Sequence, residues 1–539
     1  MTRSEPPLEA WVRNFFEGLP LLNHFVSRSD LSWVRNQRLS NRCHMKKVRN
    51  VTRLSIYIYK YTNVLRPFPQ SSKTETVMHT HFPSSPSSRA VESRAGGRLL
   101  LLSAVVAALG SLLFGFDTAV ISGTTAALRH TFALNDNLLG FTVSSALIGT
   151  MAGALGAGRP ADWWGRRPML TFLAGLFLIS AAGCTGAWNW YALLFFRFLG
   201  GLAVGAASVV CPMYITEIAP AKRRGFLVCV SQLNIVIGIL LAYLSNYLVT
   251  RFLGAANPDV WRWMFGVMAI PSLAFLATAL AIPESPRWLV KKNRLAEAKA
   301  VLTRFGHEDP ARENLEIQES LSAETTGVSD RLFQRKYLKP LLLVCMIAIF
   351  NQLDGINAVL YYTADIFRMA GADTSSALMQ SVIIGLTNLV MTIVGMALID
   401  RVGRKALLLV GSVTFVISHS LAAWVFATHT QGWIVIVALM GVVGSHAYSQ
   451  GAVVWVVINE LLPNAVRASG SAVACFLMWT LCAAVGWGFP VIAKASGAMA
   501  FGFFALMMVA QFVLVAKFLP ETKGVSLEEL QKHLSGRSE

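Results

Sequence analysis

Charged residues are scarce in this sequence and unevenly placed. Only 14% of the 539 residues are Asp, Glu, Lys or Arg, whereas 54% are hydrophobic and the mean hydropathy is +0.52. A soluble domain carries charge on about a quarter of its residues. This shortage excludes an ordinary soluble enzyme and predicts a polytopic membrane protein.

Sequence patterns for several kinds of chemistry are missing as well. The sequence contains no GxxxxGK loop for a nucleotide phosphate, no His/Glu metal cluster and no identifiable Ser/His/Asp set. Of the seven cysteines, one lies in the N-terminal tail and six lie in or at the ends of apolar runs, without metal-site spacing. We therefore expect no metal, no cofactor and no enzymatic activity.

Long apolar runs dominate what is present. Runs of about 20 residues, the length that crosses a bilayer, recur along most of the chain. The candidate spans are 99–123, 138–157, 168–187, 191–215, 226–250, 262–282, 338–363, 375–399, 405–427, 432–457, 469–492 and 498–519.

The excess of positive charge gathers in the N-terminal tail and in the loops on one side of these spans. Residues 1–98 hold sixteen of the 47 Lys/Arg but only six of the 29 Asp/Glu. Further clusters follow the even-numbered spans, whereas the opposite loops hold few, such as Arg129 and Arg251. By the positive-inside rule, both termini and the long central loop are expected to be cytoplasmic. Nucleic acid is not an expected partner.

The spans fall into two groups of six. We expect a tail (1–97), an N-terminal bundle (98–283), a cytoplasmic loop with short helices (284–337), a C-terminal bundle (338–520) and a C-terminal tail (521–539). Met78 would be a suitable start, so residues 1–77 are either an over-extended reading frame or a regulatory tail.

An internal repeat relates the two groups of spans. "RPADWWGRRPML" (159–170) resembles "LIDRVGRKALLL" (398–409), and two later pairs of segments recur at nearly the same offset. Such repeats are typical of transporters whose halves move around a central site. Charged residues recur at the ends of spans, which favours a cytoplasmic gate over solvated loop charge. The proposed gate residues are Asp162, Arg166, Glu217, Arg224, Glu284, Arg287, Asp400, Arg404, Glu460 and Arg467.

A family resemblance rests on motifs that occur in order between about 97 and 526. They are "GRPADWWGRR", "RFLGGLAVG", "PMYITEIAPAKRRG", "PESPRW", "NQLDGINAVLYY", "DRVGRK" and "PETKG". The chain resembles the sugar porters of the major facilitator superfamily, and among them the bacterial proton-coupled pentose and hexose porters. The resemblance implies an all-α membrane protein with twelve transmembrane helices in two pseudo-symmetric six-helix bundles around one sugar site.

The resemblance also implies which residues bind the sugar. They are Phe114, Gln232, Asn351, Gln352, Asn357, Asn388, Trp455 and Trp479. Amide side chains both donate to and accept from hydroxyl groups, and aromatic rings supply flat walls, so these residue types suit a sugar. The alternative for each amide is an ordinary hydrogen bond between helices.

Several residues depart from the family pattern. Asn351 stands where relatives usually have a second glutamine, Asp354 is an unusual acid in that segment, and Ala452 replaces a common proline. His446 stands where relatives have an aromatic or apolar residue, and it is either a packed neutral side chain or one with a substrate or pH role. The identity of the sugar or polyol therefore stays open.

An acid also lies inside the first span. Ionisable residues within a membrane are costly and are candidates for function. In proton-coupled relatives an Asp at the position of Asp117 and an Arg at that of Arg197 carry the proton coupling, and a static ion pair is the alternative. The leading hypothesis is a monomeric proton–monosaccharide symporter in the cell membrane. The alternatives are a passive facilitator, a sugar sensor and, more distantly, a membrane-embedded enzyme.

Overall fold

The computed structural model describes residues 86–220, 224–326, 332–430 and 432–525. The expectations about residues 1–77 lie outside these ranges. The described part is helical, and twelve of its helical stretches are long and apolar enough to cross a membrane. The predicted all-α fold with twelve spans is confirmed.

The first six spans come from seven helices, because the sixth span is divided. They are α3 (Pro86–Thr131), α4 (Asp136–Gly156), α6 (Arg166–Thr185), α7 (Trp190–Ile218), α8 (Arg224–Leu253), α9 (Val260–Val267) and α10 (Ala269–Ala279). A short α5 (Gly158–Trp164) precedes α6. Three further helices follow, α11 (Pro286–Lys291), α12 (Leu295–Arg304) and α13 (Pro310–Thr326).

The second six spans include two that are interrupted. They are α14 (Arg335–Leu353) with α15 (Ile356–Met369), α16 (Thr374–Val402), α17 (Arg404–Ala427), α18 (Trp433–Tyr448) with α19 (Gln450–Leu461), α20 (Arg467–Ala495) and α21 (Gly497–Phe518). Gly355 separates α14 from α15 with φ +76°, a left-handed conformation that glycine adopts without steric cost. Ser449 separates α18 from α19.

Glycines allow the helices to approach closely within the first half. A Cβ atom on Gly205 of α7 would lie 1.9 Å from the carbonyl oxygen of Thr150 in α4. A Cβ atom on Gly115 of α3 would lie 1.8 Å from the carbonyl oxygen of Ile235 in α8. Small residues at helix crossings are a general feature of membrane proteins, where packing replaces the hydrophobic effect between helices.

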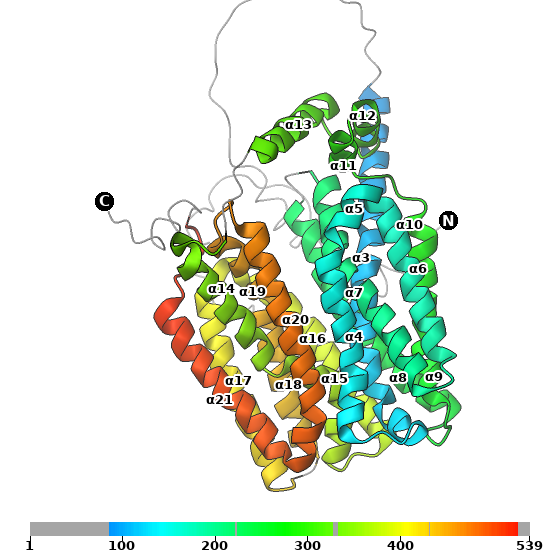
Figure 1. Cartoon of the computed structure of the whole chain (residues 1–539), viewed down its shortest axis with the longest axis vertical. Helices are drawn as coiled ribbons and strands as arrows, with labels where there is room; N and C mark the ends of the chain where they lie inside the picture. Colours follow the sequence, from blue (N-terminus) through cyan, green and yellow to red (C-terminus); the bar gives the residue numbers. More distant parts are fainter. Residues whose placement is uncertain (1–85, 221–223, 327–331, 431, 526–539) are drawn as a thin grey trace, which may run out of the picture. The chain divides into compact units, whose positions relative to one another are not determined.

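The helices form two groups that meet along a limited set of contacts (Figure 1). The helices from α3 to α10 form the N-terminal half and those from α14 to α21 form the C-terminal half. The halves meet where α4 packs on α20, α8 on α16 and α3 on α15. We call the end that carries α11–α13 the loop side and the opposite end the far side.

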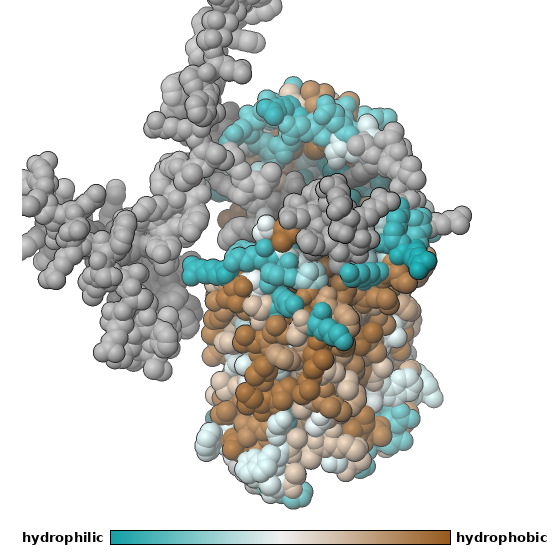
Figure 2. Space-filling model, turned by 90° about the vertical axis from the view of Figure 1, so that its left-hand side faces the viewer, coloured by the Kyte–Doolittle hydropathy of each residue, from teal (hydrophilic) through white to brown (hydrophobic). Residues whose placement is uncertain are grey.

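The outer surface of the spans carries many hydrophobic side chains. Figure 2 shows hydrophobic side chains over the middle of the face in view, with hydrophilic residues toward its ends. Large apolar side chains within the spans, such as Leu342, Ile393 and Leu506, are more than half exposed. An exposed apolar band of this extent fits the hydrocarbon of a bilayer rather than water.

Candidate substrate and proton sites

A chain of side-chain amides crosses the C-terminal half where α14 ends. Asn357 Nδ2 donates to Gln352 Oε1 (2.7 Å), and Gln352 Nε2 donates to Asn351 Oδ1 (2.8 Å). Asn351 Nδ2 donates to Gln450 Oε1 (3.4 Å), and Gln450 Nε2 donates to Gln511 Oε1 (2.9 Å). The chain thereby links α15, α14, α19 and α21. Asn351 lies in its middle, so its contacts suit a role in positioning Gln352.

Two other predicted sugar-binding amides remain unpaired. The side-chain amides of Gln232 on α8 and Asn388 on α16 make no hydrogen bond within the described ranges, although Asn388 is buried. Amides without a protein partner are free to bond to the hydroxyl groups of a ligand. These two residues lie on the helix pair α8–α16, which joins the halves.

The predicted aromatic residues lie in two places. The ring of Phe114 on α3 lies 5.8 Å from the ring of Trp479 on α20, so these two side chains meet across the boundary between the halves. Trp455 on α19 is 42% exposed, which leaves its ring face accessible. Aromatic faces of this kind can stack on the C–H face of a sugar.

The acid in the first span is paired as the sequence suggested. Arg197 on α7 donates from Nη1 to Oδ1 of Asp117 on α3 at 2.7 Å, and both side chains are buried. The guanidinium also lies over the ring of Phe265, 5.6 Å from its centroid, and its Nε has no described partner. Asp117 follows Phe114 by one helical turn, so this pair adjoins the boundary between the halves.

The acid in the α14–α15 break is also buried and paired. Asp354 accepts a hydrogen bond from His446 Nδ1 of α18 at 2.7 Å and from the backbone N–H of Ile356 at 2.9 Å. Its backbone carbonyl accepts from His419 Nε2 of α17 at 2.8 Å. Asp354 therefore joins three helices at the point that separates Gln352 from Asn357.

Charged residues at the loop side of the N-terminal half form one network. Arg166, at the start of α6, pairs with Glu217 of α7 (2.8 Å) and with Asp162 of α5 (3.1 Å). Glu284 accepts hydrogen bonds from the backbone N–H groups of Arg166 (2.9 Å) and Arg167 (3.2 Å). Gly165 leaves room for the Glu284 carboxylate, because a Cβ there would lie 2.3 Å from Oε2.

The C-terminal half repeats this network. Arg404, at the start of α17, pairs with Glu460 of α19 and with Asp400 of α16, both at 3.3 Å. Glu521 accepts from the backbone N–H groups of Arg404 (2.9 Å) and Lys405 (3.1 Å), as Glu284 does in the first half. The ion pairs of both networks stay within one half, so their pairing does not bridge the halves.

The two repeated glutamates differ in ionisation. Burial raises the pKa of Glu284 despite its backbone hydrogen bonds. Burial also opposes ionisation of Glu521, but the N–H groups of Lys523, Arg404, Lys405 and Thr522 together lower its pKa. The carboxyl groups at these two equivalent positions therefore differ in their affinity for a proton.

Two other predicted gate arginines make contacts outside the pairs described above. Arg287 on α11 donates to Ser320 Oγ at 3.3 Å. Arg467 on α20 donates to the backbone carbonyl of Leu462 at 3.3 Å. The Arg224 side chain lies outside the described part of the structure.

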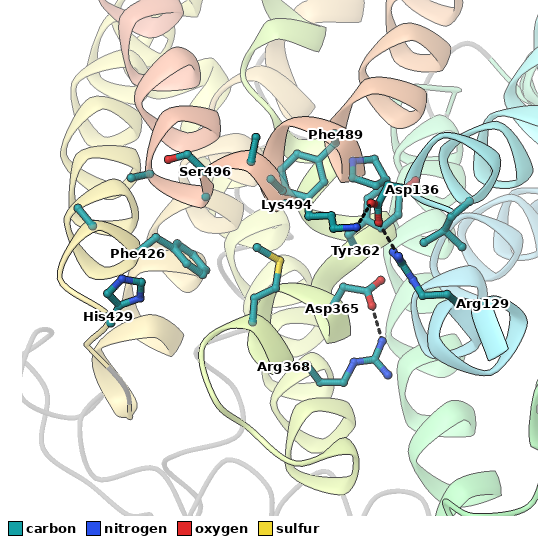
Figure 3. Close-up of a pocket in the computed structure, with 18 residues that line it drawn as sticks. Arg129, Asp136, Tyr362, Asp365, Arg368, Phe426, His429, Phe489, Lys494 and Ser496 are labelled. Carbon is teal, nitrogen blue, oxygen red and sulfur yellow. Dashed lines mark hydrogen bonds and ion pairs between the residues drawn. The ribbon is translucent and has the colours of Figure 1, made fainter. Parts of the chain in front are cut away.

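Contacts between the halves gather at the far side. Lys494 of α20 pairs with Asp136 of α4 (2.7 Å), which also accepts from Arg129 (2.5 Å). Nearby, Trp487 Nε1 donates to Asn137 Oδ1 at 2.6 Å. These residues adjoin a cavity of about 760 Å³ that both halves line (Figure 3).

Reasoning from the sequence missed three residues of these sites. Gln450 and Gln511 carry the amide chain beyond Asn351, and their amides within apolar spans were a signal that could have found them. Glu521 was present in the repeated "PETKG" segment, opposite Glu284, but was not included in the gate.

Comparison with known proteins gives the same picture. The family model described as "Sugar (and other) transporter" matches residues 103–534. The D-xylose-proton symporter of Escherichia coli is 36% identical, over 79% of this chain and 94% of its own. The arabinose-proton symporter of Bacillus subtilis is 36% identical, over 82% of this chain and 96% of its own.

Solved structures agree as well. The inward-open structure of the E. coli xylose transporter XylE matches with a TM-score of 0.72 and 34% identity, over 80% of this chain and 99% of its own. The twelve spans, the repeated motifs and these matches over most of the chain lead to one conclusion: this protein belongs to the Sugar (and other) transporter family.

Proposed function

We propose that this protein is a proton-coupled monosaccharide symporter that works by alternating access. The observation that carries the proposal is the buried Asp117–Arg197 pair, one helical turn from Phe114 at the boundary between the halves. A buried carboxylate beside one arginine can take up a proton when its surroundings change. Relatives named as proton symporters of xylose and arabinose support this function.

The sugar would bind between the two halves. Gln352 and Asn357 would offer amide groups from the C-terminal half, with Asn351 behind them, and Gln232 would do so from the N-terminal half. Asn388, Trp455, Trp479 and Phe114 would complete the site. One chain supplies every one of these residues, which supports a functional monomer.

The far-side contacts favour an inward-facing state. Lys494–Asp136 and Trp487–Asn137 tie the halves together at one end, while the loop-side ion pairs each remain inside one half. The positive loops indicate that the loop side is cytoplasmic and that both termini lie there. The chain would then be a multi-pass protein of the cell membrane that is closed toward the outside.

The test is sugar-induced proton movement in proteoliposomes. Xylose, arabinose, glucose, galactose and fructose are added in turn while the external pH is recorded. We expect alkalinisation with at least one sugar. Sugar entry without proton movement would make the protein a facilitator, and no sugar movement would point to polyols and then to a sensor.

Asp117→Asn separates coupling from binding. The variant is expected to lose accumulation against a gradient while it retains sugar exchange, because the titrating group is removed and the amide sites are intact. Asp259→Asn, a change at an exposed far-side acid, serves as the matched control. If Asp117→Asn concentrates sugar as well as the unchanged protein does, Asp117 is not the coupling site.

A further inference from the structure

We propose that the Asp354–His446 pair is a second proton-binding site and that its proton sets the affinity of the sugar site. The proposal rests on the proposed sugar transport, and it concerns a site separate from Asp117–Arg197. It starts from the position of Asp354, a fully buried acid in the helix break between Gln352 and Asn357.

The charge of Asp354 needs a partner. Burying an ionised carboxylate without an opposite charge is costly. Within the described ranges, no Lys or Arg side chain bonds to Asp354, and its one titratable side-chain partner is His446. When His446 carries a proton on both ring nitrogens, the pair is a neutral ion pair. When the ring loses one proton, a net negative charge is left inside the span.

The neighbouring titratable groups do not replace that partner. His419 on α17 donates from Nε2 to the Asp354 carbonyl, and its buried Nδ1 has no described partner, which fits a neutral ring. Tyr361 and Cys482, on α15 and α20, bond to one another. Tyr362 of α15 donates to the carbonyl of Gly486. Further titratable groups on the packed helices are engaged elsewhere or lie near helix ends, and they include Asp117, Asp365, Arg368, Asp400, Arg401, Arg404, Lys405, Tyr448, Glu460, Arg467 and Lys494.

The proton reaches the pair through the imidazole. The side chain of Asp354 is 0% exposed, whereas that of His446 is 18% exposed. The ring edge with Cδ2 and Nε2 packs over Gly451 of α19, 3.2 Å from where a Cβ would stand. Gly451 lies one helical turn before Trp455, so this edge adjoins the face that carries a predicted sugar-binding ring.

The pair is connected to the sugar site through the backbone. Asp354 lies two residues beyond Gln352, and it accepts from the N–H of Ile356, which directly precedes Asn357 at the start of α15. Loss of the proton would leave Asp354 as an unpaired anion, and the break would rearrange to reduce that cost. The amides on either side of the break would move with it, so sugar would bind more weakly as the pH rises.

The test measures sugar affinity against pH in the Asp117→Asn background, which removes the other proton site. The probe is whichever of D-xylose, L-arabinose or D-glucose binds most tightly at pH 6, and the dissociation constant is measured from pH 5 to pH 9. We expect the affinity to fall by about five-fold or more across this range, as is common for coupled sites.

Two further changes assign the effect. Adding His446→Gln together with Asp354→Asn is expected to make the affinity independent of pH, because neither proton acceptor of the pair remains. Adding Asp354→Asn alone is expected to weaken the pH dependence, because the anion that deprotonation would leave unpaired is gone. His130→Gln, at an exposed far-side histidine, should retain the full pH dependence. A flat profile in Asp117→Asn alone, or an unchanged slope when both members of the pair are replaced, would overturn the proposal.

A direct titration tests the proton-binding site without measuring transport. The imidazole of His446 is followed by NMR in histidine-labelled protein in lipid nanodiscs, with His446→Gln to assign its signal. We expect its ring signals to change with pH over the same range in which the sugar affinity changes, and we expect Asp354→Asn to alter that response. No titration in this range would refute the proton site even if sugar moves. Titration in a protein that binds no sugar would support the proton site and refute both its link to sugar affinity and the proposed function.

Discussion

Glu284 and Glu521 occupy equivalent positions in the two halves, yet their carboxyl groups differ. Each accepts hydrogen bonds from backbone N–H groups where a span begins. Burial dominates at Glu284 and raises its pKa, whereas four backbone donors outweigh burial at Glu521 and lower its pKa. The same local fold is therefore stabilised by a proton in one half and by a negative charge in the other.

Opposite pH trends should follow for these two acids. Because the pKa of Glu521 is lower in the folded state, its stabilisation is complete above about pH 4.5 and is lost as the pH falls through the folded value. The unfolding temperature lost in Glu521→Gln should therefore be larger at pH 7 than at pH 4. Because the pKa of Glu284 is raised, the unfolding temperature lost in Glu284→Gln should shrink as the pH rises above about 4.5. Parallel trends in the two variants would contradict this assignment.

The amide chain should show graded effects along its length. Gln450→Leu removes the link to Asn351, so Gln352 loses its support and sugar affinity should fall by about ten-fold. The change also leaves buried amides unsatisfied, at a cost of about 1–3 kcal/mol in unfolding free energy. Equilibrium sugar binding and thermal unfolding measure the two effects.

Gln511→Leu is the matched comparison, because it removes only the last link of the chain. It should destabilise the protein by a similar amount but weaken sugar binding much less. Equal losses of affinity in both variants would mean that the chain does not position Gln352.

Single residues were predictable where their type was unusual for their place. Asp117 and Arg197 could be paired in advance, because two opposite charges within apolar spans need one another. Gln450 and Gln511 were missed, because a sequence does not give the rotation of each helix about its axis. That rotation determines which amides face one another. It also determines that Asn351 lies inside the amide chain.

At the scale of the helices, hydropathy located the spans to within several residues, because polar caps and loops end each apolar run. Asn135, for example, caps the start of α4 by accepting from Leu138 N. Hydropathy did not locate the break at Ser449 or the division between α9 and α10, since it reports length and composition but not backbone direction. The break at Gly355 was foreseeable from a glycine among polar residues.

The contact between α3 and α8 should tolerate no side chain at Gly115. Gly115→Ala would place its Cβ against the carbonyl oxygen of Ile235, so the two helices must separate. We expect a lower unfolding temperature and less folded protein in detergent, measured by thermal unfolding and size-exclusion chromatography. Gly175→Ala on α6 is the control, because its Cβ meets nothing within 4 Å and alanine favours a helix.

At the scale of the whole molecule, the two halves carry matching networks on the loop side but are joined at the far side. The repeat was predictable, because three sequence pairs share nearly one offset. The far-side contacts between the halves were not predictable, since Lys494, Asp136 and Trp487 have no counterparts in the repeated motifs. Contacts between halves depend on how the halves dock, which the repeat does not specify.

Breaking the far-side ion pair should shift the balance between the two states. Lys494→Ala removes the cross-half partner of Asp136, whose other partner, Arg129, belongs to its own half. The lysine is 72% exposed, so the pair contributes about 1 kcal/mol or less and the shift should be no more than about five-fold. Hydrogen exchange should become faster at the start of α4 and the end of α20.

Lys517→Ala, at the loop-side end of α21, should leave this exchange pattern unchanged. Faster exchange along whole helices in Lys494→Ala would indicate general unfolding and would contradict a specific opening of the far side.

The exposure of Lys494 has a further consequence. Dissolved ions screen an exposed ion pair, and at about 0.15 M salt the screening length is about 8 Å. Brackish surroundings would therefore loosen the far-side closure that dilute surroundings preserve. The resting orientation proposed for this carrier would thus respond to the salinity of the medium on that face.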